Sequence, residues 1–143
     1  MIHLIVGPEG SGKTKCITDR MQAAAPRADG NMVYITRGRE DSWTIPAAIR
    51  LVDLTEFPTI RTYGEVYALI CGLLSGNYDI TDIYVDSVYS LCDHQPAELL
   101  IFLGMVQELS GARHADFTFT LSANPDELPN ELFQLAADVQ VCK

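Results

Sequence analysis

The chain has 143 residues, which is enough for one domain with a substantial hydrophobic core and little room for insertions. Its formal net charge of −9, from 19 acidic and 10 basic residues, argues against a nucleic-acid partner because an acidic surface repels the phosphate backbone. No apolar run is long enough to span a membrane, and the first residues do not resemble a signal peptide. These features predict a single cytoplasmic domain over residues 1–143, without a membrane or nucleic-acid partner.

Cysteine spacing bears on two further classes of site. The four cysteines are widely spaced and include no C-x-x-C pair, so the sequence suggests neither a zinc site nor a redox motif. We expect buried free thiols, because free cysteine behaves as a small hydrophobe. The four residues are Cys16, Cys71, Cys92 and Cys142.

The first predicted strand, Ile2–Val6, leads directly into the sequence Gly-Pro-Glu-Gly-Ser-Gly-Lys-Thr. This stretch matches the phosphate-binding pattern G-x-x-x-x-G-K-[ST], with a strand before it and a predicted helix over 13–25 after it, as the pattern requires. Its backbone N–H groups and the helix N-terminus form an anion cradle. Glycines are needed because a Cβ would block left-handed backbone angles and the close approach of phosphate. The alternative is a glycine-rich turn without a ligand.

The loop therefore predicts a nucleotide phosphate site. We expect Lys13 to supply a positive charge to the β and γ phosphates, and the Thr14 hydroxyl to take one coordination position on Mg²⁺. The predicted nucleotide-binding residues are the loop and the residue after it: Gly7, Pro8, Glu9, Gly10, Ser11, Gly12, Lys13, Thr14 and Lys15.

Strands and a helix are also predicted in the next part of the chain. Helix-breaking residues follow the first helix and lead to a predicted strand over 32–36, which completes a βαβ unit. The stretch 50–54 is a candidate short strand. Thr62 and Glu65 have the capping-box spacing, so a helix is expected over 63–75. The helix carries apolar residues on nearly all of its sides. It must therefore be covered on more than one side, either within the monomer or at a subunit interface.

A strand with an acid at its end follows. The run 80–86 is rich in β-forming residues and ends in Asp86, the position of the acid that holds Mg²⁺ beside the phosphate loop in P-loop proteins. Asp86 is therefore predicted as a metal-site residue with Thr14, and as a catalytic residue with Lys13. The alternative is an aspartate that caps the following helix.

The remaining elements continue the alternation of helix and strand. Pro96 at a first helical position and the apolar series up to Leu109 predict another helix, and a strand with alternating polar residues is expected over 116–122. A turn and helix start is expected at 124–127, and a last strand over 137–142. The predicted fold is a three-layer α/β P-loop NTPase fold with a mostly parallel central sheet of about five strands.

This order of elements resembles the RecA-like division of P-loop nucleoside triphosphatases, and nearly the whole chain takes part. It is also similar to small stand-alone bacterial P-loop proteins that bind ATP. The resemblance implies a role for a polar residue at the end of the strand that follows the one ending in Asp86. This residue would contact the γ-phosphate or the attacking water. By position this catalytic candidate is Ser122, with Asn124 as a neighbour, and an ordinary turn residue is the alternative.

One departure from the family pattern concerns the catalytic base. RecA-like hydrolases place a glutamate next to the metal-binding acid or at the end of a neighbouring strand, whereas Asp86 is followed by Ser87 and the second strand ends without a carboxylate. Nothing in the sequence assigns this role to Glu9, Glu40 or Asp41. Hydrolysis should be slow while binding stays tight, since the cradle, the loop lysine and the metal provide most of the electrostatic stabilisation.

Other residues are candidates for contacts with the phosphates or with a partner. An arginine finger is one such role, and a solvated surface position is the alternative for each arginine. Trp43 is a candidate contact for a partner or for the nucleotide base. The arginines considered are Arg37, Arg39 and Arg113.

The leading functional prediction is Mg²⁺-dependent binding of a nucleoside triphosphate with slow hydrolysis. ATP is preferred over GTP because no N-K-x-D guanine signature occurs. Such a chain would be a nucleotide-dependent switch or minimal ATPase, read by a protein partner or by its own oligomer. The enzymatic alternative is a nucleoside or nucleotide kinase, although the arginine-rich lid of such kinases is absent. A third alternative, a loop kept only as a relic of the fold, is opposed by the intact motif.

Overall fold

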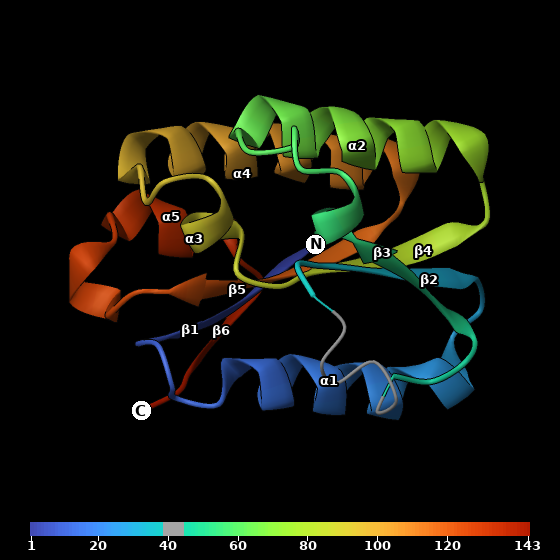
Figure 1. Cartoon of the computed structure of the whole chain (residues 1–143), viewed down its shortest axis with the longest axis horizontal. Coiled ribbons are helices and arrows are strands. Elements are labelled where there is room, and N and C mark those ends of the chain that lie inside the picture. Colours follow the sequence, from blue (N-terminus) through green and yellow to red (C-terminus); the bar gives the residue numbers. More distant parts are fainter. Residues whose placement is uncertain (39–44) are drawn as a thin grey trace.

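The computed structural model describes residues 1–38 and 45–143. In this part of the chain, six strands form one sheet in the order β3-β2-β4-β5-β1-β6, and every neighbouring pair is parallel (Figure 1). The strands are β1 (Ile2–Gly7), β2 (Asn31–Thr36), β3 (Ile49–Asp53), β4 (Ile80–Val85), β5 (Asp116–Ser122) and β6 (Asp138–Val141). The helices are α1 (Lys13–Ala24), α2 (Tyr63–Gly76), α3 (Val88–Leu91), α4 (Pro96–Arg113) and α5 (Asn130–Leu135).

Helices cover both faces of the sheet, so the fold has three layers. The long helices α2 and α4 lie on one face and α1 lies on the other (Figure 1). Parallel strands require crossover connections, which helices commonly supply. The predicted three-layer α/β class is confirmed. The sheet has six strands rather than about five, because the candidate strand at 50–54 forms β3 and pairs with β2 at the sheet edge.

The two faces of the sheet differ in composition. Along β5, Phe117, Phe119 and Leu121 belong to the large core cluster, which also takes residues from α2 and α4. Thr118 and Thr120 alternate with them and point to the side of α1, because successive side chains of a strand face opposite ways. A smaller cluster, which includes Ile17 and Met21 of α1, packs on that second face.

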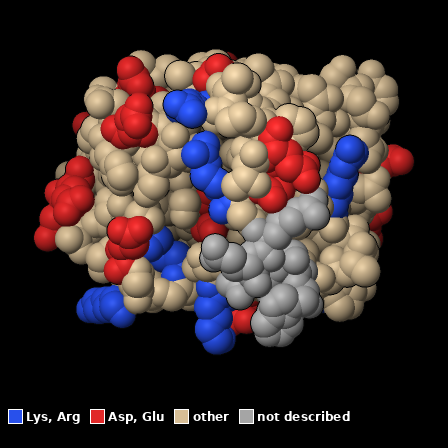
Figure 2. Space-filling view, viewed as in Figure 1, with Lys and Arg blue, Asp and Glu red and all other residues tan. Residues whose placement is uncertain are grey.

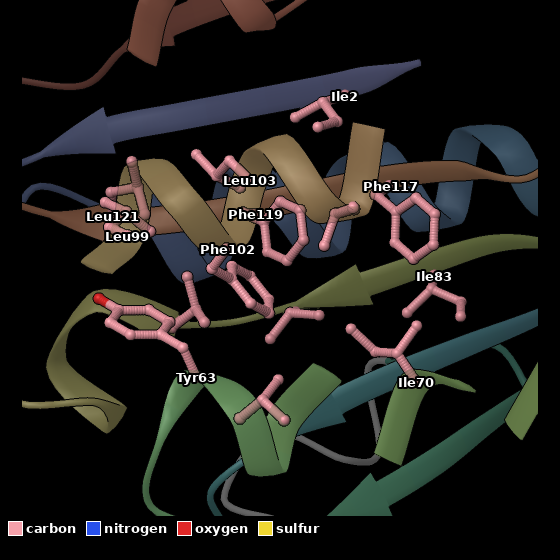
Figure 3. Packing of buried hydrophobic residues seen from close by; sticks show 14 of the residues in the cluster. Ile2, Tyr63, Ile70, Ile83, Leu99, Phe102, Leu103, Phe117, Phe119 and Leu121 are labelled. Carbon is pink, nitrogen blue, oxygen red and sulfur yellow. The ribbon is translucent and has the colours of Figure 1, made fainter. Parts of the chain in front are cut away.

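An aromatic series runs through the large core (Figure 3). Phe102 of α4 lies between Tyr63 of α2 and Phe119 of β5, with ring centroids 5.3 Å and 5.6 Å away. Further along α2, Ile70 and Leu74 are buried in the same cluster. The inner side of α2 is therefore covered within the monomer, and a subunit interface on its outer side stays a prediction.

Helix α2 begins at the predicted capping box. The Thr62 hydroxyl accepts a hydrogen bond from the Glu65 N–H at 3.1 Å, and Glu65 Oε1 accepts one from the Thr62 N–H at 3.0 Å. These reciprocal bonds satisfy two backbone donors that the helix itself leaves without partners.

The helices of the described residues include none with the length and apolar character that a membrane span requires.

Two elements after β4 differ from what the sequence predicts. Helix α3 has only four residues, which are too few to show a helical period in the sequence. The helix start expected at 124–127 forms only a short 3-10 helix, and α5 begins later. The reason is Pro129, since the residue before a proline is disfavoured in the α region and the first helix turn cannot continue through it.

Candidate functional site

Residues 8–12 form the turn between β1 and α1 at the carboxyl edge of the sheet (Figure 1). Gly10 and Gly12 have φ angles of 80° and 86°, a left-handed conformation that L side chains rarely adopt. Gly7 is required because of crowding. A Cβ there would lie 2.5 Å from the Cys142 carbonyl oxygen and 2.6 Å from Ser11 Oγ. The backbone of the loop thus requires glycine at all three positions.

The helix that follows the loop begins without compensating groups. Gly12 is its N-cap and offers no side-chain acceptor, and the first turn holds no acidic residue. The first N–H groups of a helix lack intrahelical partners and carry the positive end of the helix dipole. The start of α1 is therefore suited to bind an anion such as phosphate.

Two polar side chains are buried in the loop. Lys13 is 6% exposed, and its Nζ donates a hydrogen bond to the Pro8 carbonyl oxygen at 2.8 Å. The Ser11 hydroxyl oxygen is buried and has no hydrogen-bond partner among the described residues. Burying an ammonium group or an unpaired hydroxyl costs free energy unless a partner compensates. An anion seated in the loop would provide such a partner.

Asp86 follows β4 and meets the loop, although β5 lies between β4 and β1 in the sheet. Its Oδ2 accepts a hydrogen bond from the Thr14 hydroxyl at 3.2 Å, and its Oδ1 accepts one from the Thr120 hydroxyl at 2.5 Å. The Thr120 oxygen in turn accepts a bond from the Ser87 N–H at 2.6 Å. Thr120 is fully buried, so it holds the carboxylate of Asp86 from the interior of the sheet.

Thr14 and Asp86 fit a hard divalent cation. Mg²⁺ takes oxygen ligands, and proteins usually hold it through one or two side chains together with water and substrate phosphates. Thr14 and Asp86 bring a hydroxyl and a carboxylate oxygen within 3.2 Å of each other. Among the described residues, no group of three or more His, Cys, Asp or Glu could hold a metal. Two protein ligands are the number that commonly hold Mg²⁺ together with phosphate oxygens and water.

A small cavity of about 150 Å³ lies beside Asp86. Arg37, from the end of β2, reaches it and donates to the Ile60 carbonyl oxygen at 3.4 Å. The described lining contains no second carboxylate, so this part of the site offers hydroxyl groups and a positive charge but no carboxylate base. The lining residues are Arg37, Asp86, Ser87, Ser90 and Leu91.

The remaining predicted site residues lie around the loop in different ways. Ser122 pairs with Gly7 in the register of β5 with β1, which places it beside the start of the loop. Lys15 is exposed and forms an ion pair with Asp19 at 2.9 Å. The hydrogen bond that Lys15 Nζ donates to this carboxylate raises the pKa of the Lys15 amine. Glu9 is exposed within the loop.

The other candidates lie farther from the loop or outside the described residues. Arg113 donates to the Leu74 carbonyl oxygen at 2.6 Å and lies 4.9 Å from the Tyr78 ring. It precedes the start of β5, at the opposite edge of the sheet from the loop, so it does not contact the phosphate loop of its own chain. The predicted candidates Arg39, Glu40, Asp41 and Trp43 lie outside the described residues.

Two residues near Asp86 were not singled out from the sequence. Thr120 occupies the strand whose polar alternation was predicted, so that alternation was the signal, although only the sheet order shows which threonine meets Asp86. Ser90 comes from α3, which has no sequence pattern long enough to reveal it.

A second polar pocket lies on the α1 side, toward the amino ends of the strands. Its volume is about 290 Å³. Asp138 of β6 accepts hydrogen bonds from His3 and Arg20 beside it. Burial opposes ionisation of Asp138, but these two partners outweigh it and lower the pKa of the carboxyl. The lining includes His3, Arg20, Arg27, Asp82, Tyr84 and Thr118.

Charged side chains are mixed on the face that Figure 2 shows. Basic groups form a broken line across it, with acidic groups on both sides and uncharged residues over most of the area. The described residues form no continuous basic surface on this face. The absence of a nucleic-acid partner stays a prediction.

The fold is similar to that of a solved protein. The crystal structure of the flagellar accessory protein FlaH from Methanocaldococcus jannaschii matches with a TM-score of 0.62 and 14% sequence identity, over 98% of this chain and 70% of that chain. At this identity the likeness shows the fold alone, a three-layer α/β arrangement around a parallel sheet. No family model matches the chain, and no curated protein matches it.

Proposed function

We propose that the chain binds a Mg²⁺-nucleoside triphosphate, ATP in preference to GTP, and hydrolyses it slowly. One observation carries the proposal. The Thr14 hydroxyl and the Asp86 carboxylate, 72 positions apart, are in contact at the carboxyl edge of the sheet, directly after the glycine-dependent loop. In parallel α/β sheets ligands bind at this edge, outside the carboxyl ends of the strands.

Each part of the loop has a role in this proposal. The backbone N–H groups at Gly12 and the first turn of α1 donate to phosphate oxygens, and the Lys13 ammonium group neutralises their charge. Asp86, held by Thr120, and the Thr14 hydroxyl would hold the cation, which would supply electrostatic stabilisation of negative charge on the phosphates. These groups provide binding and electrostatic stabilisation.

Slow turnover follows from the groups beside Asp86. The described cavity lining offers Arg37 and hydroxyl groups rather than a second carboxylate that could orient an attacking water. We therefore propose a nucleotide-dependent switch, whose state is read by a protein partner or by a second copy of the chain. The kinase alternative uses the same loop and differs in requiring an acceptor.

Thermal unfolding with a nucleotide panel tests the proposal. Mg-ATP and a non-hydrolysable analogue should raise the melting temperature more than Mg-GTP, because a ligand of the native state adds to its stability. Phosphate release, followed in parallel, should be slow, on the order of 10⁻³ s⁻¹. Such rates are typical of P-loop proteins that lack an arginine finger from a partner. No shift with any nucleotide would support the relic alternative. Rapid nucleotide consumption with one acceptor from a panel would support a kinase.

A further inference from the structure

Cys16 and Cys142, which the sequence does not connect, meet beside the phosphate loop. Their Sγ atoms lie 3.3 Å apart, although the residues are 126 positions apart in the chain. Cys16 belongs to the first half of α1, and Cys142 directly follows β6; the C-terminus accordingly lies near the start of α1 in Figure 1. Both are free thiols.

The backbone of each cysteine is hydrogen-bonded to one end of the loop. The Cys142 N–H donates to the Val6 carbonyl oxygen at 2.8 Å, just before the loop begins. The Cys16 N–H donates to the Gly12 carbonyl oxygen at 3.0 Å, where the loop ends. A bond between the two sulfur atoms would therefore join the strand side and the helix side of the loop.

We propose that Cys16 and Cys142 form a reversible disulfide, and that this disulfide weakens nucleotide binding at the loop. A disulfide bond is about 2.05 Å long, so the sulfur atoms must approach by about 1.3 Å. This approach draws the first turn of α1 toward β6 and shifts N–H donors that must match phosphate oxygens. The effect on binding rests on the proposed function, whereas formation of the disulfide does not.

The oxidant in this proposal is a low-molecular-weight disulfide such as glutathione disulfide. Cys16 is the more exposed thiol, and its sulfur attacks one sulfur of the oxidant. The S–S bond of the oxidant breaks, one small thiol leaves with the Cys16 proton, and a mixed disulfide remains. The Cys142 sulfur then attacks Cys16 Sγ and releases the second small thiol with the Cys142 proton. The protein loses two hydrogen atoms, which reduce the oxidant to two thiols.

The other cysteines differ in their surroundings. Cys92 is 3% exposed in the large core, where burial raises the pKa of its thiol to about 12. Cys71 is half-buried on α2, on the opposite face of the sheet from α1. A half-buried thiol without a partner thiol makes Cys71→Ser the matched control for Cys16→Ser.

Peptide mapping of the full chain tests formation of the disulfide. Trypsin releases Cys16 in residues 16–20, Cys142 in residues 114–143, and both other cysteines in residues 62–113. After treatment of the reduced protein with excess glutathione disulfide, we expect a link between the first two peptides. A reductant should remove it, Cys16→Ser should abolish it, and Cys71→Ser should leave it unchanged. A persistent glutathione adduct at Cys16, or a link to residues 62–113, would overturn the pairing.

A titration with Mg-ATP tests the effect on binding. The dissociation constant should rise on the order of tenfold on oxidation, return on reduction, and stay constant in Cys16→Ser. A disulfide that forms without a change in affinity would overturn the proposed weakening. If the reduced protein binds no nucleotide, the proposed function and the effect on binding both fail, while the peptide map still decides whether the pair forms.

Discussion

The two faces of β5 differ in what they contribute. One face presents Phe117, Phe119 and Leu121 to the large core beneath α2 and α4. The other presents threonines toward α1, and one of them, Thr120, is bonded to Asp86. Because side chains alternate along a strand, stability and the candidate site depend on residues that are adjacent in the sequence. Substitutions on the two faces should therefore separate stability from nucleotide binding.

Phe119→Ala should have the largest effect. Phe119 is fully buried, with its ring 5.6 Å from that of Phe102 and 6.2 Å from that of Phe117. Loss of this side chain leaves a cavity, so the free energy of unfolding should fall by about 3–5 kcal/mol in chemical denaturation. Nucleotide affinity, measured where the variant is still folded, should not change. A stability loss below about 1 kcal/mol would show that the core relaxes around the site.

Lys13→Ala should lower nucleotide affinity and leave stability unchanged, which is the opposite of the effect expected for Phe119→Ala. Hydrogen bonds to charged groups contribute about 1.5–3 kcal/mol, so the affinity for Mg-ATP should fall by roughly 10- to 100-fold in calorimetric titration. Stability without nucleotide should be maintained, because a buried ammonium group is removed. Lys15→Ala, which removes an exposed neighbour paired with Asp19, is the control and should bind almost normally. Equal losses in both variants would mean that general charge, rather than the loop, determines affinity.

Thr120→Val changes the site face of β5 without changing its shape. The half-buried Ser87 N–H loses its acceptor, so the free energy of unfolding should fall by about 0.5–1.5 kcal/mol. Asp86 also loses the donor that orients it, and the Mg²⁺ concentration needed for half-maximal nucleotide binding should rise. Thr118→Val is the matched control, since Thr118 lines the amino-edge pocket two positions earlier. Equal shifts of the Mg²⁺ requirement in both variants would contradict a role for Thr120 in orienting Asp86.

The smallest effect concerns the capping box of α2, a helix that packs on the large core. Hydrogen bonds from the Arg61 N–H and from Thr62 lower the pKa of Glu65 below its usual 4.5. A lowered carboxyl pKa stabilises the fold above the unfolded value, and this stabilisation disappears as the pH falls through the folded value. In Glu65→Gln, stability should therefore fall less steeply than in the wild type as the pH drops below 4.5. Denaturation curves across that range check this, and identical slopes would contradict it.

Contiguous features of the molecule could be predicted from the sequence. The turn between β1 and α1 lies within consecutive residues, and its conformation depends on glycine backbone angles. The capping box at Thr62 and Glu65 is equally local, and it forms as predicted. The position of Asp86 beside Thr14 follows from an acid at the end of a parallel strand, because the carboxyl ends of such strands share one edge.

Features assembled across the sheet could not be predicted. Thr120 contacts Asp86 because β5 lies next to β4, an order that no single segment specifies. The two sulfur atoms of Cys16 and Cys142 meet because β6 lies next to β1, at the start of α1. Their spacing in the sequence carries no such information. Whether the chain acts as a single domain stays a prediction.

The location of the bound nucleotide tests the central claim most directly. Backbone amide NMR spectra recorded during titration with Mg-ATP would report on both edges of the sheet. We predict the largest shifts at the loop amides from Gly10 to Thr14 and at Ser87, with little change around His3 and Asp82. The largest shifts at the amino-edge pocket, or no shifts at all, would contradict a nucleotide site built on the phosphate loop and Asp86.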